Sequence, residues 1–117
     1  MTTATEVPRG VVLSETELVE RVRADRAAGL TFSFSNGCFD VLHVGHLRYL
    51  VGSAAEADRL IVAVNDDASV SALKGRDRPI QEAADRAGLI AALRMVDYVV
   101  VFSDLTVDRL LTRLTPE

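Results

Sequence analysis

Residues 36–46 read Asn36-Gly37-Cys38-Phe39-Asp40-Val41-Leu42-His43-Val44-Gly45-His46, and the rest of the chain is organised around them. It follows a short apolar run with β-strand character at residues 31–35 and opens into a helical pattern at Leu47. A strand, a tight turn and a helix N-terminus in succession leave backbone N–H groups that favour anions. The stretch therefore predicts a phosphate-binding turn where a strand passes into a helix.

The two histidines of the chain, His43 and His46, both lie in this stretch, three residues apart. Positions i and i+3 share one face of a helix, so both imidazoles can address a single ligand. Gly45 lies between them and lacks a Cβ, which lets that ligand approach the backbone closely. A lone histidine is more often structural, but this pair favours two donors to a phosphate and an enzyme that acts on a nucleotide.

Length, charge and cysteine content limit the class of protein. The 117 residues, 49% of them hydrophobic, make one domain at most. The net charge of −4 argues against a general nucleic-acid-binding surface, so a local cluster must hold any anionic ligand. No apolar run approaches the roughly 18 residues that span a bilayer, and the polar N-terminus does not resemble a signal peptide. The lone Cys38 excludes an internal disulfide framework, and we expect a reducing, cytoplasmic setting.

The rest of the pattern predicts one α/β domain. Residues 1–13 read as an N-terminal tail with a short extended piece at its end, and residues 14–29 as an accessory helix that a Ser14/Glu17 capping box starts. We expect a catalytic core over residues 31–117, within a single domain of residues 14–117. Its strands are expected at residues 31–35, 60–64 and 97–102, its helices at residues 47–57, 81–93 and 106–114, and a charged loop at residues 71–79.

The expected fold is a Rossmann-like three-layer sandwich with a parallel sheet, and with His-x-Gly-His at the first strand-to-helix turn. The strand at residues 60–64 is continuously apolar, which fits a parallel sheet covered on both faces. Ligands bind such sheets at the C-terminal strand ends, so the carboxylates that follow this strand share an edge with the histidines. Asp67 is either a ligand-side group or the N-cap of the next helix, and Asp40 either a ligand-side group or a cap.

The motif resembles a known signature. Asn-Gly-Cys-Phe-Asp-x-x-His-x-Gly-His at residues 36–46 is similar to that of the cytidylyltransferase-like nucleotidyltransferase superfamily. The form with Asn36 and Cys38 is similar to the D-glycero-β-D-manno-heptose 1-phosphate adenylyltransferases. The segments Lys74-Gly75, Arg78-Pro79 and Asp85-Arg86 resemble the family's Lys-Gly…Arg-Pro…Arg pattern. The resemblance implies an enzyme that transfers AMP from ATP to a sugar phosphate, releasing pyrophosphate and forming ADP-heptose.

The resemblance also implies the site residues. It makes His43, His46 and Lys74 catalytic, Asp40 and Asp67 substrate-binding, and six further residues nucleotide-binding: Asn36, Gly37, Cys38, Phe39, Gly45 and Arg86. Mg²⁺ would bridge phosphate oxygens, with Asp40 as the nearest carboxylate and no dedicated metal site. ATP and a sugar phosphate are the expected partners, nucleic acid and membranes are not, and the composition permits a homodimer.

Other functions stay open at this point. One is a cytidylyltransferase for glycerol 3-phosphate or another alcohol phosphate. Another is a non-catalytic nucleotide-binding fragment. Family members continue with further strands and a Ser/Thr-rich segment, and nothing in this sequence matches that segment. The expected catalytic core is therefore C-terminally short. A dinucleotide-dependent oxidoreductase is not expected, since no G-x-G-x-x-G follows the first core strand.

Overall fold

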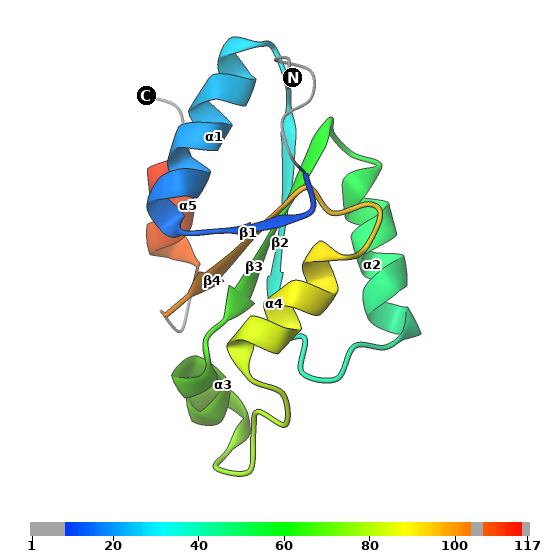
Figure 1. Ribbon diagram of the computed structural model, residues 1–117, viewed down its shortest axis with the longest axis vertical. Coiled ribbons are helices and arrows are strands. Elements are labelled where there is room, and N and C mark those ends of the chain that lie inside the picture. The colour runs from blue at the N-terminus through cyan, green and yellow to red at the C-terminus, as the bar shows by residue number, and fades with distance from the viewer. Residues whose placement is uncertain (1–8, 104–106, 116–117) are drawn as a thin grey trace.

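A parallel four-stranded sheet with helices on both faces forms the body of the computed structural model, which describes residues 9–103 and 107–115 (Figure 1). The elements in chain order are β1 (Val11–Leu13), α1 (Glu15–Ala27), β2 (Phe32–Gly37), α2 (Val44–Ala54), β3 (Arg59–Asn65), α3 (Asp67–Lys74), α4 (Ala83–Ala91), β4 (Tyr98–Phe102) and α5 (Asp108–Leu114). The strand order is β1-β4-β3-β2, and every pairing is parallel.

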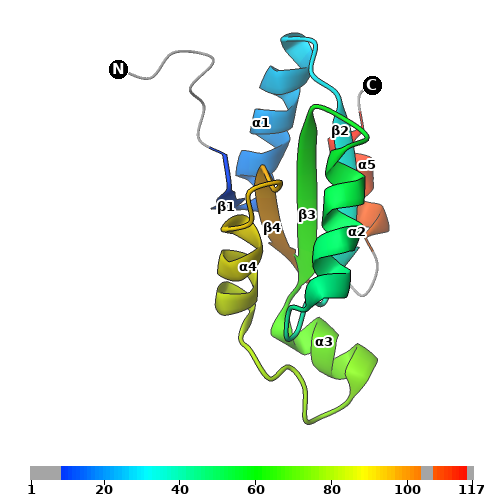
Figure 2. The same ribbon diagram turned by 90° about the vertical axis from the view of Figure 1, so that its right-hand side faces the viewer.

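The two central strands divide the core into two layers. Along β3, alternate side chains point to opposite faces, so Ile61 and Ala63 enter one cluster while Leu60, Val62 and Val64 enter the other. Helices α1 and α5 cover the first face, and α2 and α4 cover the second (Figures 1 and 2). The predicted α/β architecture with a parallel sheet is confirmed.

Helix α1 begins where the sequence predicted. The Ser14 hydroxyl oxygen accepts a hydrogen bond from the Glu17 N–H at 3.1 Å, and the Glu17 carboxylate accepts one from the Ser14 N–H at 2.8 Å. The helix ends before Gly29, whose φ of 88° is the left-handed conformation that glycine adopts without strain. Arg109 and Arg113 of α5 both donate to Glu15, which joins the two helices on this face.

The structure corrects three details of the sequence prediction. The extended piece Val11–Leu13 is a fourth strand, paired with β4, so the histidine motif follows the second strand of the chain rather than the first. The first half of the predicted loop at residues 71–79 belongs to α3. This helix forms because the carboxylate of Asp66, not that of Asp67, accepts the Ser69 N–H at 2.8 Å as the N-cap.

From the sequence we expect no membrane-spanning segment, and the lengths of the helices can be compared with that expectation. Within residues 9–103 and 107–115, no helix has the length and apolar character that a bilayer span requires.

Candidate nucleotide-binding site

A cleft of about 540 Å³ lies at the C-terminal end of β2, where the motif turn leads into α2. Eight of its lining residues were expected in the site: Asn36, Gly37, Cys38, Phe39, Asp40, His43, His46 and Lys74. Three more line it that the sequence did not place there: Val41, Tyr49 and Arg78. Gly45, Asp67 and Arg86, which were also expected, are not part of this lining.

The motif turn has an unusual backbone. Phe39 and Val41 have φ values of 49° and 67°, in the left-handed region that non-glycine residues rarely adopt. Each such residue costs on the order of 1–3 kcal/mol, so surrounding contacts must hold the turn in this shape. One contact is the Val41 N–H, which donates to the side-chain oxygen of Gln81 at 3.2 Å. Another is the ring of Phe39, which is buried and meets the His46 ring edge-on at a centroid distance of 5.3 Å.

The two histidines meet as the spacing predicted. Their rings stack with centroids 4.0 Å apart and an interplanar angle of 29°. His43 is the N-cap of α2, and His46 lies in its first turn. The Nδ1 atom of His46 accepts the His43 N–H at 3.1 Å, and the Nδ1 atom of His43 accepts the Gly45 N–H at 3.0 Å. The backbone N–H groups that the sequence assigned to an anion are therefore partly satisfied by the imidazoles themselves.

These hydrogen bonds indicate which ring nitrogen of each histidine carries the proton. A neutral imidazole whose Nδ1 accepts a hydrogen bond carries its proton on Nε2, so each ring presents an Nε2–H donor. Burial lowers the pKa of His46, and the neighbouring His43 and the positive charge of Lys74 lower it further. His46 is accordingly a neutral donor at physiological pH, suited to a phosphate oxygen.

Gly45 has a different role from the one expected. A Cβ at this position would lie 2.8 Å from Cε1 and 3.0 Å from Nδ1 of His43, so the histidine ring fills the space that the sequence left to a ligand. Glycine is required here because it lets the His43 ring fold back onto the start of α2. Gly45 therefore acts through His43.

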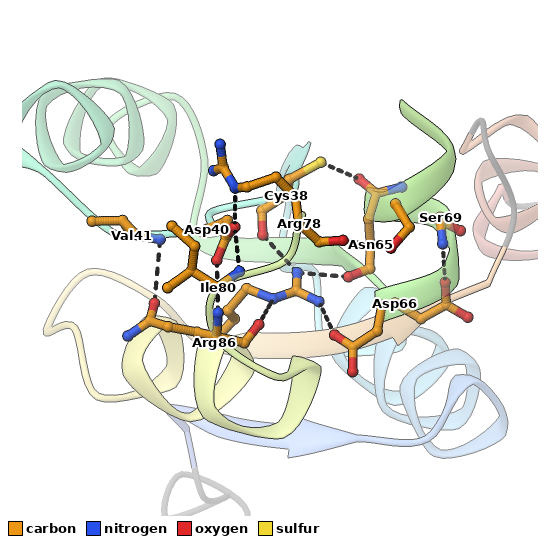
Figure 3. Close-up of polar contacts among 12 residues, drawn as sticks. Cys38, Asp40, Val41, Asn65, Asp66, Ser69, Arg78, Ile80 and Arg86 are labelled. Atoms are coloured by element: carbon orange, nitrogen blue, oxygen red, sulfur yellow. Dashed lines mark hydrogen bonds and ion pairs between the residues drawn. The ribbon is translucent and has the colours of Figure 1, made fainter. Parts of the chain in front are cut away.

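Asp40 connects the motif turn to the segment before α4. Its side chain is fully buried and accepts hydrogen bonds from Arg78 Nε at 2.6 Å, Ile80 N at 2.8 Å and Gln81 N at 3.0 Å (Figure 3). Burial alone would raise the pKa of Asp40, but these three donors outweigh it and lower the pKa to about 2. The carboxylate thus caps a distant segment, and it has no exposed oxygen for a substrate.

Arg86 is the largest departure from the sequence prediction. Its side chain is fully buried and donates to three backbone carbonyl oxygens, of Cys38 and Asn65 at 2.7 Å each and of Gln81 at 2.9 Å, while its NH2 donates to the Asp67 carboxylate at 2.7 Å (Figure 3). The guanidinium joins the ends of β2 and β3 to the starts of α3 and α4. It is not placed to bind the phosphates, because the protein itself surrounds it.

The geometry agrees with one family. Residues 34–117 match the family described as cytidylyltransferase-like. The chain belongs to this family. Its most similar relatives include the bifunctional protein HldE of Nitrosococcus oceani, 49% identical over 111 residues, and HldE of Coxiella burnetii, 50% identical over 105 residues. These matches cover 95% and 90% of this chain but 23% and 22% of the relatives, so the chain spans under a quarter of their length.

A solved structure of similar fold supports the same family assignment. The crystal structure of the lipopolysaccharide core biosynthesis protein from Thermoplasma volcanium matches with a TM-score of 0.67 and 28% sequence identity. The match covers 75% of this chain and 70% of that chain. The predicted resemblance to the cytidylyltransferase-like superfamily, and with it the prediction of a nucleotidyltransferase domain, is confirmed.

Asp67 and Cys38, two further expected residues, both contact polar groups of the protein. Asp67 is half-exposed and faces Arg86 rather than the cleft lining. The thiol of Cys38 donates to Asn65 Oδ1 at 3.8 Å, which fits the expectation of a packed residue rather than a nucleophile.

The residues of the described segments do not offer a dedicated magnesium site. No group of three or more histidine, cysteine or carboxylate side chains in residues 9–103 and 107–115 is arranged to hold a metal ion. Asp40, the expected nearest carboxylate, is occupied by its three donors.

A second groove, of about 470 Å³, lies between α5 and the α1 side of β2. Phe32, Phe34 and Ile61 contribute to an apolar lining, and the one arginine among the lining residues, Arg26, is already engaged by the carbonyl oxygen of Leu114 and the ring of Phe32. We assign the chemistry to the histidine cleft, because that cleft combines unengaged donors with two cationic side chains.

Proposed function

We propose that this domain transfers AMP from ATP to a sugar phosphate, with heptose 1-phosphate as the acceptor, and releases pyrophosphate to form ADP-heptose. An oxygen of the sugar phosphate attacks the α-phosphorus of ATP, and the bond from that phosphorus to the oxygen bridging the α- and β-phosphates breaks. The electron pair of that bond leaves with pyrophosphate. No covalent bond to the protein is needed, so catalysis consists of positioning and stabilisation of charge.

One observation carries this proposal. Two imidazoles, each fixed through Nδ1 to a backbone N–H, line a cleft that Lys74 also lines, and this leaves the Nε2–H of each ring as a donor. As negative charge builds on the α-phosphoryl oxygens and on pyrophosphate, His43 and His46 donate hydrogen bonds to it, and Lys74 contributes positive charge. Donors that are already oriented need no rearrangement during the reaction. The heptose acceptor is inferred from the Asn36/Cys38 form of the motif and from the similarity to HldE proteins and to a lipopolysaccharide core biosynthesis protein.

The same fold supports a second candidate, transfer of CMP from CTP to glycerol 3-phosphate. The description of the matching family favours this alternative. Both candidates use the same histidines, so a panel of substrates separates them. We expect pyrophosphate release from ATP with heptose 1-phosphate, and little from CTP with glycerol 3-phosphate.

The decisive variant is His46→Asn. The Oδ1 atom of asparagine can replace Nδ1 as acceptor for the His43 N–H, but asparagine has no counterpart of Nε2. Turnover should fall by about 100-fold or more, while the urea midpoint changes little. A variant that keeps most of its turnover would show that the histidine donor is not used. A wild type that binds ATP but releases no pyrophosphate with any acceptor would favour the non-catalytic module.

A further inference from the structure

One wall of the cleft has no part in the function proposed so far. Arg78 reaches it from the segment between α3 and α4, and Tyr49 reaches it from α2, three residues after His46. Both side chains are partly open to solvent, at 33% for the Arg78 side chain and 49% for Tyr49. They line the same cleft as the histidines, so a ligand seated on the histidines would meet them.

Arg78 is held at one end only. Its Nε donates to the buried carboxylate of Asp40 at 2.6 Å, and its carbonyl oxygen accepts the hydroxyl of Ser71. The hydrogen bonds among residues 9–103 and 107–115 use neither NH1 nor NH2 of Arg78. Asp40 thereby fixes the plane of the guanidinium and leaves the terminal nitrogens as a two-donor fork. A fork that is oriented in advance suits a phosphate group, since less side-chain entropy is lost on binding.

Tyr49 offers a different type of contact. In the part of the chain that the structure describes, its hydroxyl has no hydrogen-bond partner and its ring is half-exposed at the cleft. An aromatic ring with a free hydroxyl can pack against the C–H face of a ring-shaped polyol and hydrogen-bond to its hydroxyl groups. Val41 is another exposed apolar side chain of the lining, but Tyr49 is the exposed aromatic ring there, and it adds a hydroxyl that can bind those of a sugar.

Two anionic substrates must lie side by side for the proposed reaction, with the reacting atoms roughly 3–3.5 Å apart. The histidines bind the phosphoryl group that is transferred. The acceptor brings a phosphate of its own, and Lys74 and Arg78 are the cationic side chains that line the cleft. We propose that Arg78 and Tyr49 form the acceptor subsite, in which Arg78 binds the acceptor phosphate and Tyr49 packs against its sugar ring. This inference rests on the proposed function.

The test compares kinetic constants for each substrate separately. Arg78→Ala, Tyr49→Ala and Tyr49→Phe are assayed for pyrophosphate release with ATP and heptose 1-phosphate, and with ATP and glycerol 3-phosphate. Two exposed residues from the same segments that do not line the cleft give matched controls, Arg76→Ala and Val51→Ala. Urea unfolding of each variant shows that it is folded.

Arg78→Ala should raise the KM for both acceptors by about 10- to 100-fold, because a charge-assisted hydrogen bond is lost, while the KM for ATP stays within about twofold. Tyr49→Ala should raise the KM for the heptose phosphate by roughly fivefold or more, and that for glycerol 3-phosphate little, because glycerol has no ring. Tyr49→Phe separates the ring from the hydroxyl and should retain most of the affinity. The controls should match the wild type.

Other results would overturn the assignment. A higher KM for ATP in the Arg78→Ala or Tyr49→Ala protein would place the pair on the nucleotide, and unchanged constants would remove it from the site. In both cases the wild type still turns over, so the proposed function survives. If the wild type releases no pyrophosphate with either acceptor, the proposed function fails and the subsite assignment falls with it.

Discussion

Replacing Arg86 by methionine tests whether this arginine supports the site from within or binds the nucleotide directly. The substitution keeps an unbranched side chain of similar reach but removes all hydrogen bonds of the guanidinium. Three carbonyl oxygens, of Cys38, Asn65 and Gln81, then lose a donor. An acceptor left without a partner in the interior costs about 1–3 kcal/mol.

The expected loss of stability for Arg86→Met is about 3–5 kcal/mol. The three carbonyl oxygens give about 3–9 kcal/mol if none of them finds water, and the lower part of that range is the cost of removing one partner of a buried ion pair, about 3–5 kcal/mol. Asp67 adds little, because its side chain is 47% exposed and water can replace the arginine. Domains of this kind unfold with a free energy of about 5–15 kcal/mol, so a large share of the total is at risk.

Urea unfolding followed by far-ultraviolet circular dichroism measures the effect. Arg76→Met is the matched control, since Arg76 is exposed, and it should change stability by less than about 0.5 kcal/mol. Asp67→Asn should fall between the two. If Arg86→Met instead lost less than about 1 kcal/mol while the KM for ATP rose more than tenfold, Arg86 would contact the phosphates directly and its role as an internal support would be refuted.

Two further predictions concern the histidine turn. Gly45→Ala should displace the His43 ring and weaken ATP binding by about tenfold in a calorimetric titration. Gly52→Ala is the control, because a Cβ at that position meets nothing within 4 Å. It should leave ATP binding unchanged and stabilise α2 by up to about 1 kcal/mol. Because the pKa of His46 is lowered in the folded state, the unfolded chain binds more protons below the ordinary histidine value of 6.5, so stability should fall as the pH drops from about 6.5. Urea midpoints at about pH 8 and about pH 5 should therefore differ less in His46→Asn than in the wild type; an equal difference would assign the effect to other groups.

The sequence predicted correctly those features that depend on residues close together in the chain. The capping box of Ser14 and Glu17 formed as predicted, and the i, i+3 spacing brought His43 and His46 into contact. The apolar run of β3 indicated a buried parallel strand, which it is. These features depend on residues within one turn of helix or one strand, so neighbouring residues carry most of the information.

The direction of the charged side chains was not predictable in the same way. Asp40, Asp67 and Arg86 lie in segments that the resemblance assigns to substrates, yet Asp40 and Arg86 turn inward and are satisfied by backbone groups up to 48 residues away in the chain. Such partners appear only once the strand ends meet. Tyr49 was missed for the converse reason: in the sequence it reads as one more apolar position of a helix, and only the packed structure shows that it borders the cleft.

In the proposed reaction, a chain with a net charge of −4 would bind two phosphorylated substrates, and a neutral donor such as His46 suits that task. The cleft lining carries two cationic side chains, Lys74 and Arg78, and one carboxylate, that of Asp40, which is buried and paired with Arg78. Dipolar donors would add to the attraction of these cations, and each imidazole donor is strengthened by the hydrogen bond that its ring accepts. A backbone N–H at the start of α2 polarises an imidazole through Nδ1, and the imidazole carries this polarisation to Nε2, where the phosphate would bind. Protonating His46 would remove its Nδ1 acceptor and release the His43 N–H that orients it, so the bond that builds the turn also favours the neutral form of His46. Both the shape and the chemistry of the site therefore depend on the reciprocal cap at the start of α2.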